Sequence, residues 1–169
     1  VRVLRMKEGD ELVATDGQGH FFDCTITLAS NKHCRVNINT KETAPLLWHG
    51  NIHLAVAPTK NMDRTEWLAE KATEIGVSRF IPIECDHSER RTIKHDREMR
   101  VITSAVKQSL KAYHPQLDEL TPVKKVIAAP FEGQKFIAHC DQSFGERAYL
   151  PPIIKKNENI LILIVPEGD

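Results

Sequence analysis

Six consecutive apolar residues near the end of the chain, Ile160–Val165, constrain its fold most. No polar residue interrupts the run, so it predicts a strand buried on both faces. Strands of this kind occur almost only in parallel sheets that helices cover on both sides. Pro166, Glu167 and Gly168 then predict a tight loop at the carboxyl end of the strand, where ligands bind in open α/β sheets.

Strands alternate with helices from Ile52 onward, which indicates a parallel α/β sheet. Further strands are expected at 52–58, 78–85 and 135–140. A helix is expected at 61–76, with Asp63 as candidate N-cap, Gly76 as C-cap, and Leu68, Ala72 and Ile75 on one face. A second helix is expected at 96–112, with an apolar stripe of Met99, Ile102, Val106 and Leu110.

The first 43 residues predict short antiparallel strands instead. Phe22, Cys24, Ile26 and Leu28 alternate with their neighbours at the period of a half-buried strand, and Asp16–Gly19 and Asn31–Lys32 form the turns. This pattern favours a small antiparallel barrel. Residues 41–51 form a plausible linker between the barrel and the α/β part.

Charge and cysteine content exclude several classes of protein. Lys plus Arg and Asp plus Glu both total 23, so the chain has no global nucleic-acid signature. Residues 88–125 nevertheless hold nine cations against five acids, a local basic patch. The four cysteines lie in or beside apolar stretches, so a disulfide framework or metal site is not expected. No signal peptide or membrane-spanning run occurs, which makes a cytoplasmic protein the default.

Standard catalytic motifs are absent, since no P-loop, G-x-G-x-x-G, G-x-S-x-G or H-E-x-x-H occurs. The eight histidines are dispersed. Four longer blocks carry more information, namely VLRMKEGDEL, APTKNMDRTEWLAEKATEIGVSRFIPIECDHSERR, AVKQSLKAYHP and ILILIVPEGD. In this order and spacing they resemble the 16S ribosomal RNA uridine-N3 methyltransferases, the ribosomal small subunit methyltransferase E family of the SPOUT superfamily.

The resemblance implies two domains. A PUA-like β-barrel that binds RNA would occupy residues 1–45, and a SPOUT α/β domain with a carboxyl-terminal trefoil knot would occupy 50–169. Such proteins act as homodimers on 16S ribosomal RNA or the small-subunit particle, with S-adenosyl-L-methionine as cofactor and no metal. The chain stops before the segments that complete the knot in this family, so we expect it to be truncated and impaired.

RNA contacts are expected from cations and one amide in the matching blocks, because Lys and Arg neutralise phosphate charge. They could also stabilise a developing uracil anion. The candidates are Arg5, Lys60, Arg64, Arg90, Arg91, Gln108 and Lys111. For Arg90 and Arg91 a solvated face is an equally good interpretation. The sequence predicts no particular residue as the catalytic base. Trp67 is expected to pack in the core, and Lys71 to form an ion pair with Glu74 on the helix surface.

Cofactor contacts in the SPOUT superfamily come mostly from loops after the carboxyl-terminal strands. Carried onto this chain, they fall on His139, Cys140, Asp141, Val165, Pro166, Glu167 and Gly168. Val165 stands where the family has glycine. Either the backbone there is already extended, as before proline, or cofactor approach is impaired. The alternative function is therefore a non-catalytic RNA-binding module with an α/β scaffold.

Overall fold

The computed structural model describes residues 5–30, 33–138 and 149–166. The chain divides into two compact units, Val1–Leu46 and Leu47–Asp169. The expected turn at Asn31–Lys32 lies outside the described residues. None of the helices in the described ranges is long and apolar enough to cross a membrane.

The first unit is an antiparallel sheet in the order β1-β2-β3, formed by β1 (Glu11–Thr15), β2 (His20–Ala29) and β3 (Cys34–Thr43). Cys24 and Ile26 of β2 are buried, as their alternation predicted. Cys34 of β3 is exposed, whereas Cys24 and Cys85 are buried. The described residues form an open three-stranded sheet, and closure into a barrel stays a prediction.

The second unit is built on a parallel sheet in the order β6-β5-β4-β9-β8, with β7 paired to β5. The strands are β4 (Ile52–Val56), β5 (Arg79–Glu84), β6 (Gln116–Leu117), β7 (Thr121–Pro122), β8 (Gln134–Ala138) and β9 (Ile160–Ile164). The apolar run that opened the sequence analysis is β9, and it lies between β4 and β8 as a buried strand should.

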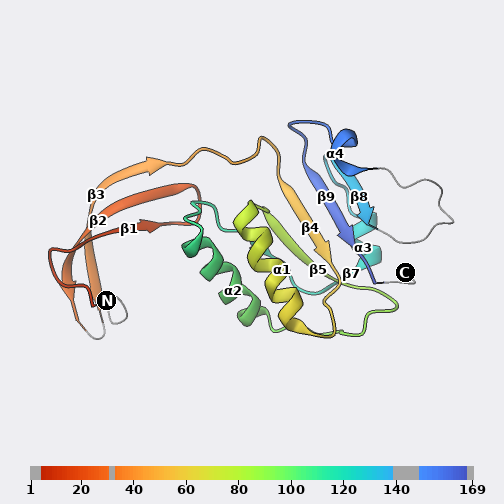
Figure 1. Ribbon diagram of the computed structural model, residues 1–169, viewed down its shortest axis with the longest axis horizontal. Coiled ribbons are helices and arrows are strands. Elements are labelled where there is room, and N and C mark those ends of the chain that lie inside the picture. The colour runs from red at the N-terminus through yellow and green to blue at the C-terminus, as the bar shows by residue number, and fades with distance from the viewer. Residues whose placement is uncertain (1–4, 31–32, 139–148, 167–169) are drawn as a thin grey trace. The chain divides into compact units, whose positions relative to one another are not determined.

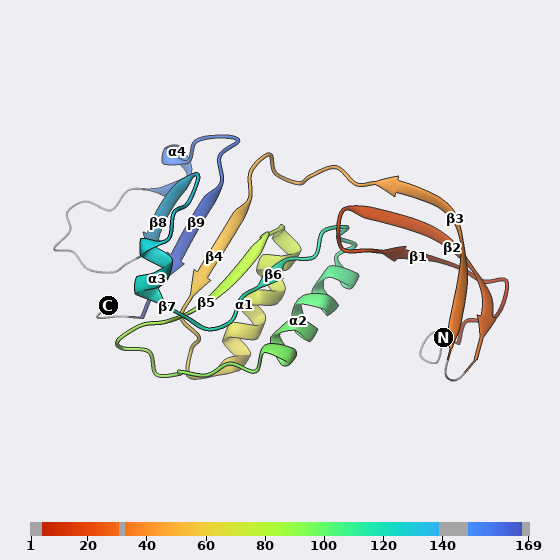
Figure 2. The same cartoon turned by 180° about the vertical axis from the view of Figure 1, so that it is seen from behind.

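Helices cover both faces of this sheet (Figure 1 and Figure 2). Successive strand residues point to opposite faces, so Leu54 and Phe80 pack with Ile102 under α1 (Met62–Ile75) and α2 (His95–Gln108). Ala55 and Ile81 pack with residues of the other face under α3 (Val123–Ala128). A short α4 (Leu150–Ile153) precedes β9. The chain order and the two layers of helix match the predicted α/β class.

Two details of α1 differ from the sequence prediction. The N-cap is Asn61, whose side chain accepts from the backbone N–H of Asp63 at 3.1 Å, so Asp63 is inside the helix and does not cap it. Gly76 is the C-cap, as predicted, in a left-handed conformation with φ of 105°. Ile75 is 62% exposed, because only Ala69, Ala72 and Thr73 of α1 are fully buried.

The stripe predicted for the second helix is also shorter than expected. Ile102 and Val106 are buried in the core. Leu110 lies beyond the end of α2, has a φ of 50° and is 77% exposed. The helix ends at Gln108 because the chain turns there to enter β6, so Leu110 cannot continue the buried face.

Candidate functional site

The carboxyl ends of the parallel strands meet at one edge of the sheet, the position where α/β proteins bind ligands. Ala57 at the end of β4 donates its backbone N–H to the carbonyl of Ile164 at the end of β9, at 3.1 Å. Ile83 and Glu84 end β5 beside them and pair with β7. We call this region the carboxyl edge, and most of the predicted site residues follow it in sequence.

The loop after β4 is fixed onto the start of α1. The hydroxyl of Thr59 donates to the carbonyl of Asn61 at 2.7 Å, and its backbone N–H donates to the hydroxyl of Thr65 at 3.1 Å. Lys60 and Arg64 are exposed on this loop and on the first turn of the helix. The hydrogen bonds hold the backbone between them, so the two cations have defined positions near the carboxyl edge.

The loop after β5 contacts the loop after β4. Arg90 donates through Nη2 to the backbone carbonyl of Lys60 at 3.0 Å, and Lys60 Nζ lies 3.6 Å from Glu89. Arg91 donates through Nη1 to Glu84 at 2.9 Å. The structure therefore brings together Lys60, Arg64, Arg90 and Arg91, four of the seven residues predicted to bind RNA.

Two cations of this cluster have no acidic partner among the described residues. Glu89 faces Lys60 and Glu84 faces Arg91, which offsets those charges. Arg64 forms no described ion pair, and Arg90 pairs only with a backbone carbonyl. The Nε of Arg90 is in addition buried with no hydrogen-bond partner in the described chain. The exposed guanidinium of Arg64 is suited to an anionic ligand, whereas the buried Nε of Arg90 is out of reach of one.

Val165 and Pro166 follow β9 at the same edge and are half-buried. The Val165 side chain packs against the core cluster that contains Ala55, Ile83 and Leu163. Arg5, Leu110 and Asn157 are the non-glycine residues with positive φ in the described chain, and Val165 is not among them. The backbone at this position therefore does not require glycine. The other predicted cofactor contacts, His139, Cys140, Asp141, Glu167 and Gly168, lie outside the described residues.

The remaining predicted RNA contacts lie elsewhere. Gln108 ends α2, and Lys111 follows in the segment that leads to the start of β6. Because α2 runs back along the sheet for about 20 Å, both residues are near the amino edge. Arg5 is exposed in the first unit. The sequence pattern did not distinguish these residues from the cluster at the carboxyl edge, because it does not show where the end of a helix lies relative to the sheet.

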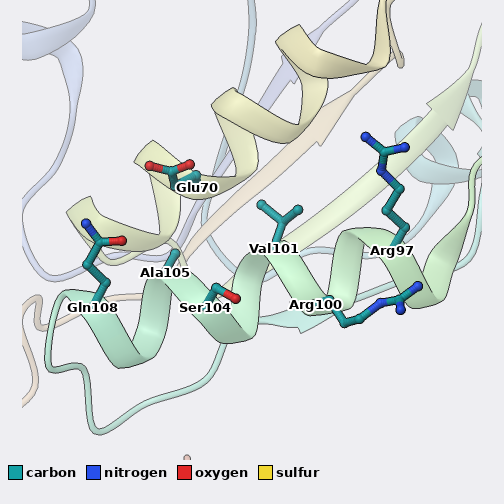
Figure 3. Close-up of a pocket in the computed structure, with 7 residues that line it drawn as sticks. All are labelled: Glu70, Arg97, Arg100, Val101, Ser104, Ala105 and Gln108. Atoms are coloured by element: carbon teal, nitrogen blue, oxygen red, sulfur yellow. The ribbon is translucent and has the colours of Figure 1, made fainter. Parts of the chain in front are cut away.

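A groove lies between α1 and α2 of the second unit, and it runs from near the carboxyl edge toward the amino edge of the sheet. It has a volume of about 280 Å³ and is lined by Glu70 of α1 and by Arg97, Arg100, Val101, Ser104, Ala105 and Gln108 of α2. Figure 3 shows Glu70 near the Ala105 and Gln108 end of α2, with Arg97 and Arg100 toward the other end of the helix. Only Gln108 was predicted to be functional. The other α2 residues of the groove recur at intervals of three and four, so they share one face of the helix. The sequence spacing alone could have identified that face.

Two further expectations about α1 have clear outcomes. Lys71 donates to Glu74 at 2.9 Å and to Glu70 at 2.8 Å, so the predicted surface ion pair is confirmed. Trp67 is 62% exposed, so its expected core packing was wrong. The buried residues of α1 are Ala69, Ala72 and Thr73, and at 3.6 residues per turn Trp67 lies on the other side of the helix.

Glu98 is a buried carboxyl group on α2. Its side chain is 4% exposed, and Oε1 has no hydrogen-bond partner in the described chain. Burial, followed by the neighbouring Glu66 carboxylate, raises the pKa of Glu98, while Arg97 opposes the shift. Arg97 itself donates to Glu66 at 2.9 Å. Within the described ranges, no group of three or more His, Cys, Asp and Glu side chains could hold a metal ion.

Comparison with known families defines the class of protein. The family model described as RNA methyltransferase domain matches residues 47–169, and the one described as RNA methyltransferase PUA domain matches residues 1–39. The chain is thus an RNA methyltransferase by family. It belongs to the ribosomal RNA small subunit methyltransferase E family.

Individual relatives are consistent with this membership. The ribosomal RNA small subunit methyltransferase E of Bacillus subtilis (strain 168) is 25% identical over 181 residues, which cover 99% of this chain and 70% of that protein. The crystal structure of a probable rRNA-methyltransferase from Porphyromonas gingivalis matches with a TM-score of 0.91 and 44% identity, over 99% of this chain and 71% of that one.

A third relative supports the fold alone. It is the ribosomal RNA small subunit methyltransferase E from Neisseria gonorrhoeae, whose structure has S-adenosyl methionine bound. It matches with a TM-score of 0.82 and 20% identity, over 98% of this chain and 68% of that one. The shared fold means that the parallel sheet and its carboxyl edge occur in both proteins.

Proposed function

We propose that this protein transfers a methyl group from S-adenosylmethionine to N3 of a uridine in 16S ribosomal RNA. Membership of the RNA methyltransferase family is the observation that carries the proposal. The carboxyl edge supports it, because Lys60, Arg64, Arg90 and Arg91 converge there from two loops and a helix. The reaction belongs in the cytoplasm, where ribosomal subunits are assembled.

The cation cluster would hold the RNA and the reacting base. S-adenosylmethionine, when bound, supplies an electrophilic methyl group. Uracil N3 would lose its proton to solvent, which develops negative charge on the base, and the nitrogen would bond to the methyl carbon as the bond from that carbon to sulfur breaks. The exposed Arg64, with Arg90 beside it, is suited to bind phosphate oxygens or to stabilise that charge. Alignment of the reacting atoms would supply much of the remaining rate. No residue of this chain is assigned as a catalytic base.

The cofactor would lie against the ends of β8 and β9. The described part of that region fits it, since the side chain of Val165 packs into the core and its backbone needs no left-handed conformation. Val165 and Pro166 would thus present backbone groups to the cofactor. His139, Cys140, Asp141, Glu167 and Gly168 complete the proposed set. Residues 1–45 would act as the PUA-like RNA-binding domain and residues 50–169 as the methyltransferase domain. The trefoil knot and the homodimer remain predictions from the family resemblance.

Methyl transfer to small ribosomal subunits tests the proposal. The subunits are taken from cells that lack this modification and incubated with the protein and S-adenosylmethionine labelled in its methyl group. We expect the label in 3-methyluridine after digestion to nucleosides, and no label in the large subunit. Label in a different nucleoside would contradict the N3 assignment. RNA binding without any cofactor binding in a calorimetric titration would favour the non-catalytic RNA-binding module.

A further inference from the structure

The groove between α1 and α2 has the composition of a site for one unpaired nucleotide. Its floor is apolar, formed by half-buried Val101 and by Ala105, which is 1% exposed. Its rim carries the hydroxyl of Ser104, the amide of Gln108 and the guanidinium of Arg100 (Figure 3). An apolar floor accepts the face of a base, and a side-chain amide can both donate to and accept from a base edge.

Most charges around the groove are paired, and Arg100 is the exception. Glu70 and Glu74 share Lys71, at 2.8 and 2.9 Å, and Arg97 donates to Glu66 at 2.9 Å. Arg100 donates only to the backbone carbonyl of Asp96, at 3.1 Å, and has no acidic partner in the described chain. One uncompensated guanidinium beside an apolar floor favours a ligand with a phosphate and a planar ring.

The position of the groove relates it to the carboxyl edge. Arg97 lies in the first turn of α2, close to the loop that carries Arg90, and Gln108 is the last residue of the helix about 16 Å away. The groove is thus a path from the cation cluster toward the amino edge. Its volume of about 280 Å³ is at the lower limit for ligand pockets and excludes a double helix.

We propose that this groove binds an unpaired nucleotide of the RNA substrate, a few nucleotides away from the uridine that is methylated. Arg100 holds its phosphate, Val101 and Ala105 contact the face of its base, and Gln108 with Ser104 binds the base edge. The proposal rests on the proposed function, and it adds Arg100, Ser104 and Val101 to the residues that contact RNA. It also gives the RNA contact predicted for Gln108 a place in the fold, away from the carboxyl edge.

Binding of a fluorescein-labelled single-stranded 12-mer RNA, followed by fluorescence anisotropy at several salt concentrations, tests the groove. We expect Arg100→Ala to raise the Kd about tenfold. It should also reduce the slope of log K against log salt by about 0.7, the value for one lost phosphate contact on a single strand. Gln108→Glu, which is nearly isosteric, should weaken binding because it places a carboxylate beside the bound nucleotide and its phosphate.

Lys156→Ala is the matched control, because it removes one exposed cation from the turn before β9, outside the groove. It should leave the Kd and the salt slope unchanged. Circular dichroism of each variant establishes that the fold is retained, as expected for the exposed side chains of Arg100 and Gln108.

The outcomes separate the groove from the proposed function. If Arg100→Ala and Gln108→Glu bind RNA as the unaltered protein does, the groove proposal is overturned while the RNA methyltransferase function stands. If the unaltered protein binds no RNA, both are overturned. Weakened binding in the two groove variants, with Lys156→Ala unaffected, supports the groove.

Discussion

Arg90 donates through Nη2 to the backbone carbonyl of Lys60, 3.0 Å away and 30 positions earlier in the chain. This hydrogen bond joins the loop after β4 to the loop after β5. It gives Arg90 a structural role alongside the RNA contact proposed for it. Variants of this residue must therefore separate a displaced loop from a lost charge.

Replacing both arginines, Arg90→Ala with Arg91→Ala, should weaken RNA binding and flatten its dependence on salt. Two lost phosphate contacts would reduce the slope of log K against log salt by about 1.4 on a single strand. Arg90→Lys with Arg91→Lys is the matched control, since it keeps both charges and loses the guanidinium geometry. Fluorescence anisotropy over a salt series provides the measurement. An unchanged slope in the double alanine variant would assign both residues to a solvated face.

Val165→Gly should destabilise the second unit without improving cofactor binding. The valine side chain packs against the core near Leu163, and its backbone conformation does not need glycine. We expect a loss of about 2 kcal/mol in the free energy of unfolding, from lost packing and added flexibility. Urea denaturation measures the stability, and calorimetry with S-adenosylmethionine measures the affinity. Val165→Ala separates packing from backbone entropy. Tighter cofactor binding in the glycine variant would show that valine obstructs the site.

The sequence predicted the second unit well because its signals are local. The uninterrupted apolar run predicts that β9 is a buried strand, and the glycine at position 76 predicts the end of α1. Each prediction depends on only a few neighbouring residues. Trp67 was assigned wrongly because its burial depends on which side of α1 faces the sheet. Ala69, Ala72 and Thr73 lie on that side, and Trp67 does not.

The candidate site was predictable only in part for a similar reason. The loops after β4 and β5 meet because their strands are parallel neighbours, which the α/β pattern implies. The groove depends instead on the spacing between two helices and on which charges neutralise each other across it. Glu66 and Arg97 are 31 positions apart, so their pairing leaves no trace in local sequence.

Gly76→Ala should destabilise the end of α1. Gly76 has a φ of 105°, and a Cβ at this position would lie 2.7 Å from Cδ1 of Leu47 and 3.1 Å from Nε1 of Trp48. We expect a loss of about 1–2 kcal/mol, measured by thermal or urea denaturation. Gly76→Asn is the comparison, because asparagine tolerates the left-handed region while its Cβ meets the same neighbours. Equal losses in both variants would assign the cost to the contact with Leu47, and no loss in either would contradict the geometry.

Glu98→Gln should change how stability depends on pH. Burial and the nearby Glu66 carboxylate raise the pKa of Glu98 above its ordinary value of 4.5, so the folded state binds this proton more tightly than the unfolded state does. The contribution of the protonated carboxyl is therefore fully present below pH 4.5, and it is lost as the pH rises toward the raised pKa. Glutamine carries no titrating proton, so the variant should lack this decline. Above that window its free energy of unfolding should exceed that of the original protein by about 1 kcal/mol.

Thermal denaturation from pH 4 to pH 8, about the range in which a perturbed carboxyl titrates, measures both stability curves. Glu132→Gln at an exposed position is the matched control and should leave the profile unchanged. Parallel stability curves for Glu98→Gln and the unaltered protein would show that folding leaves the pKa of Glu98 unchanged, which would contradict the raised pKa.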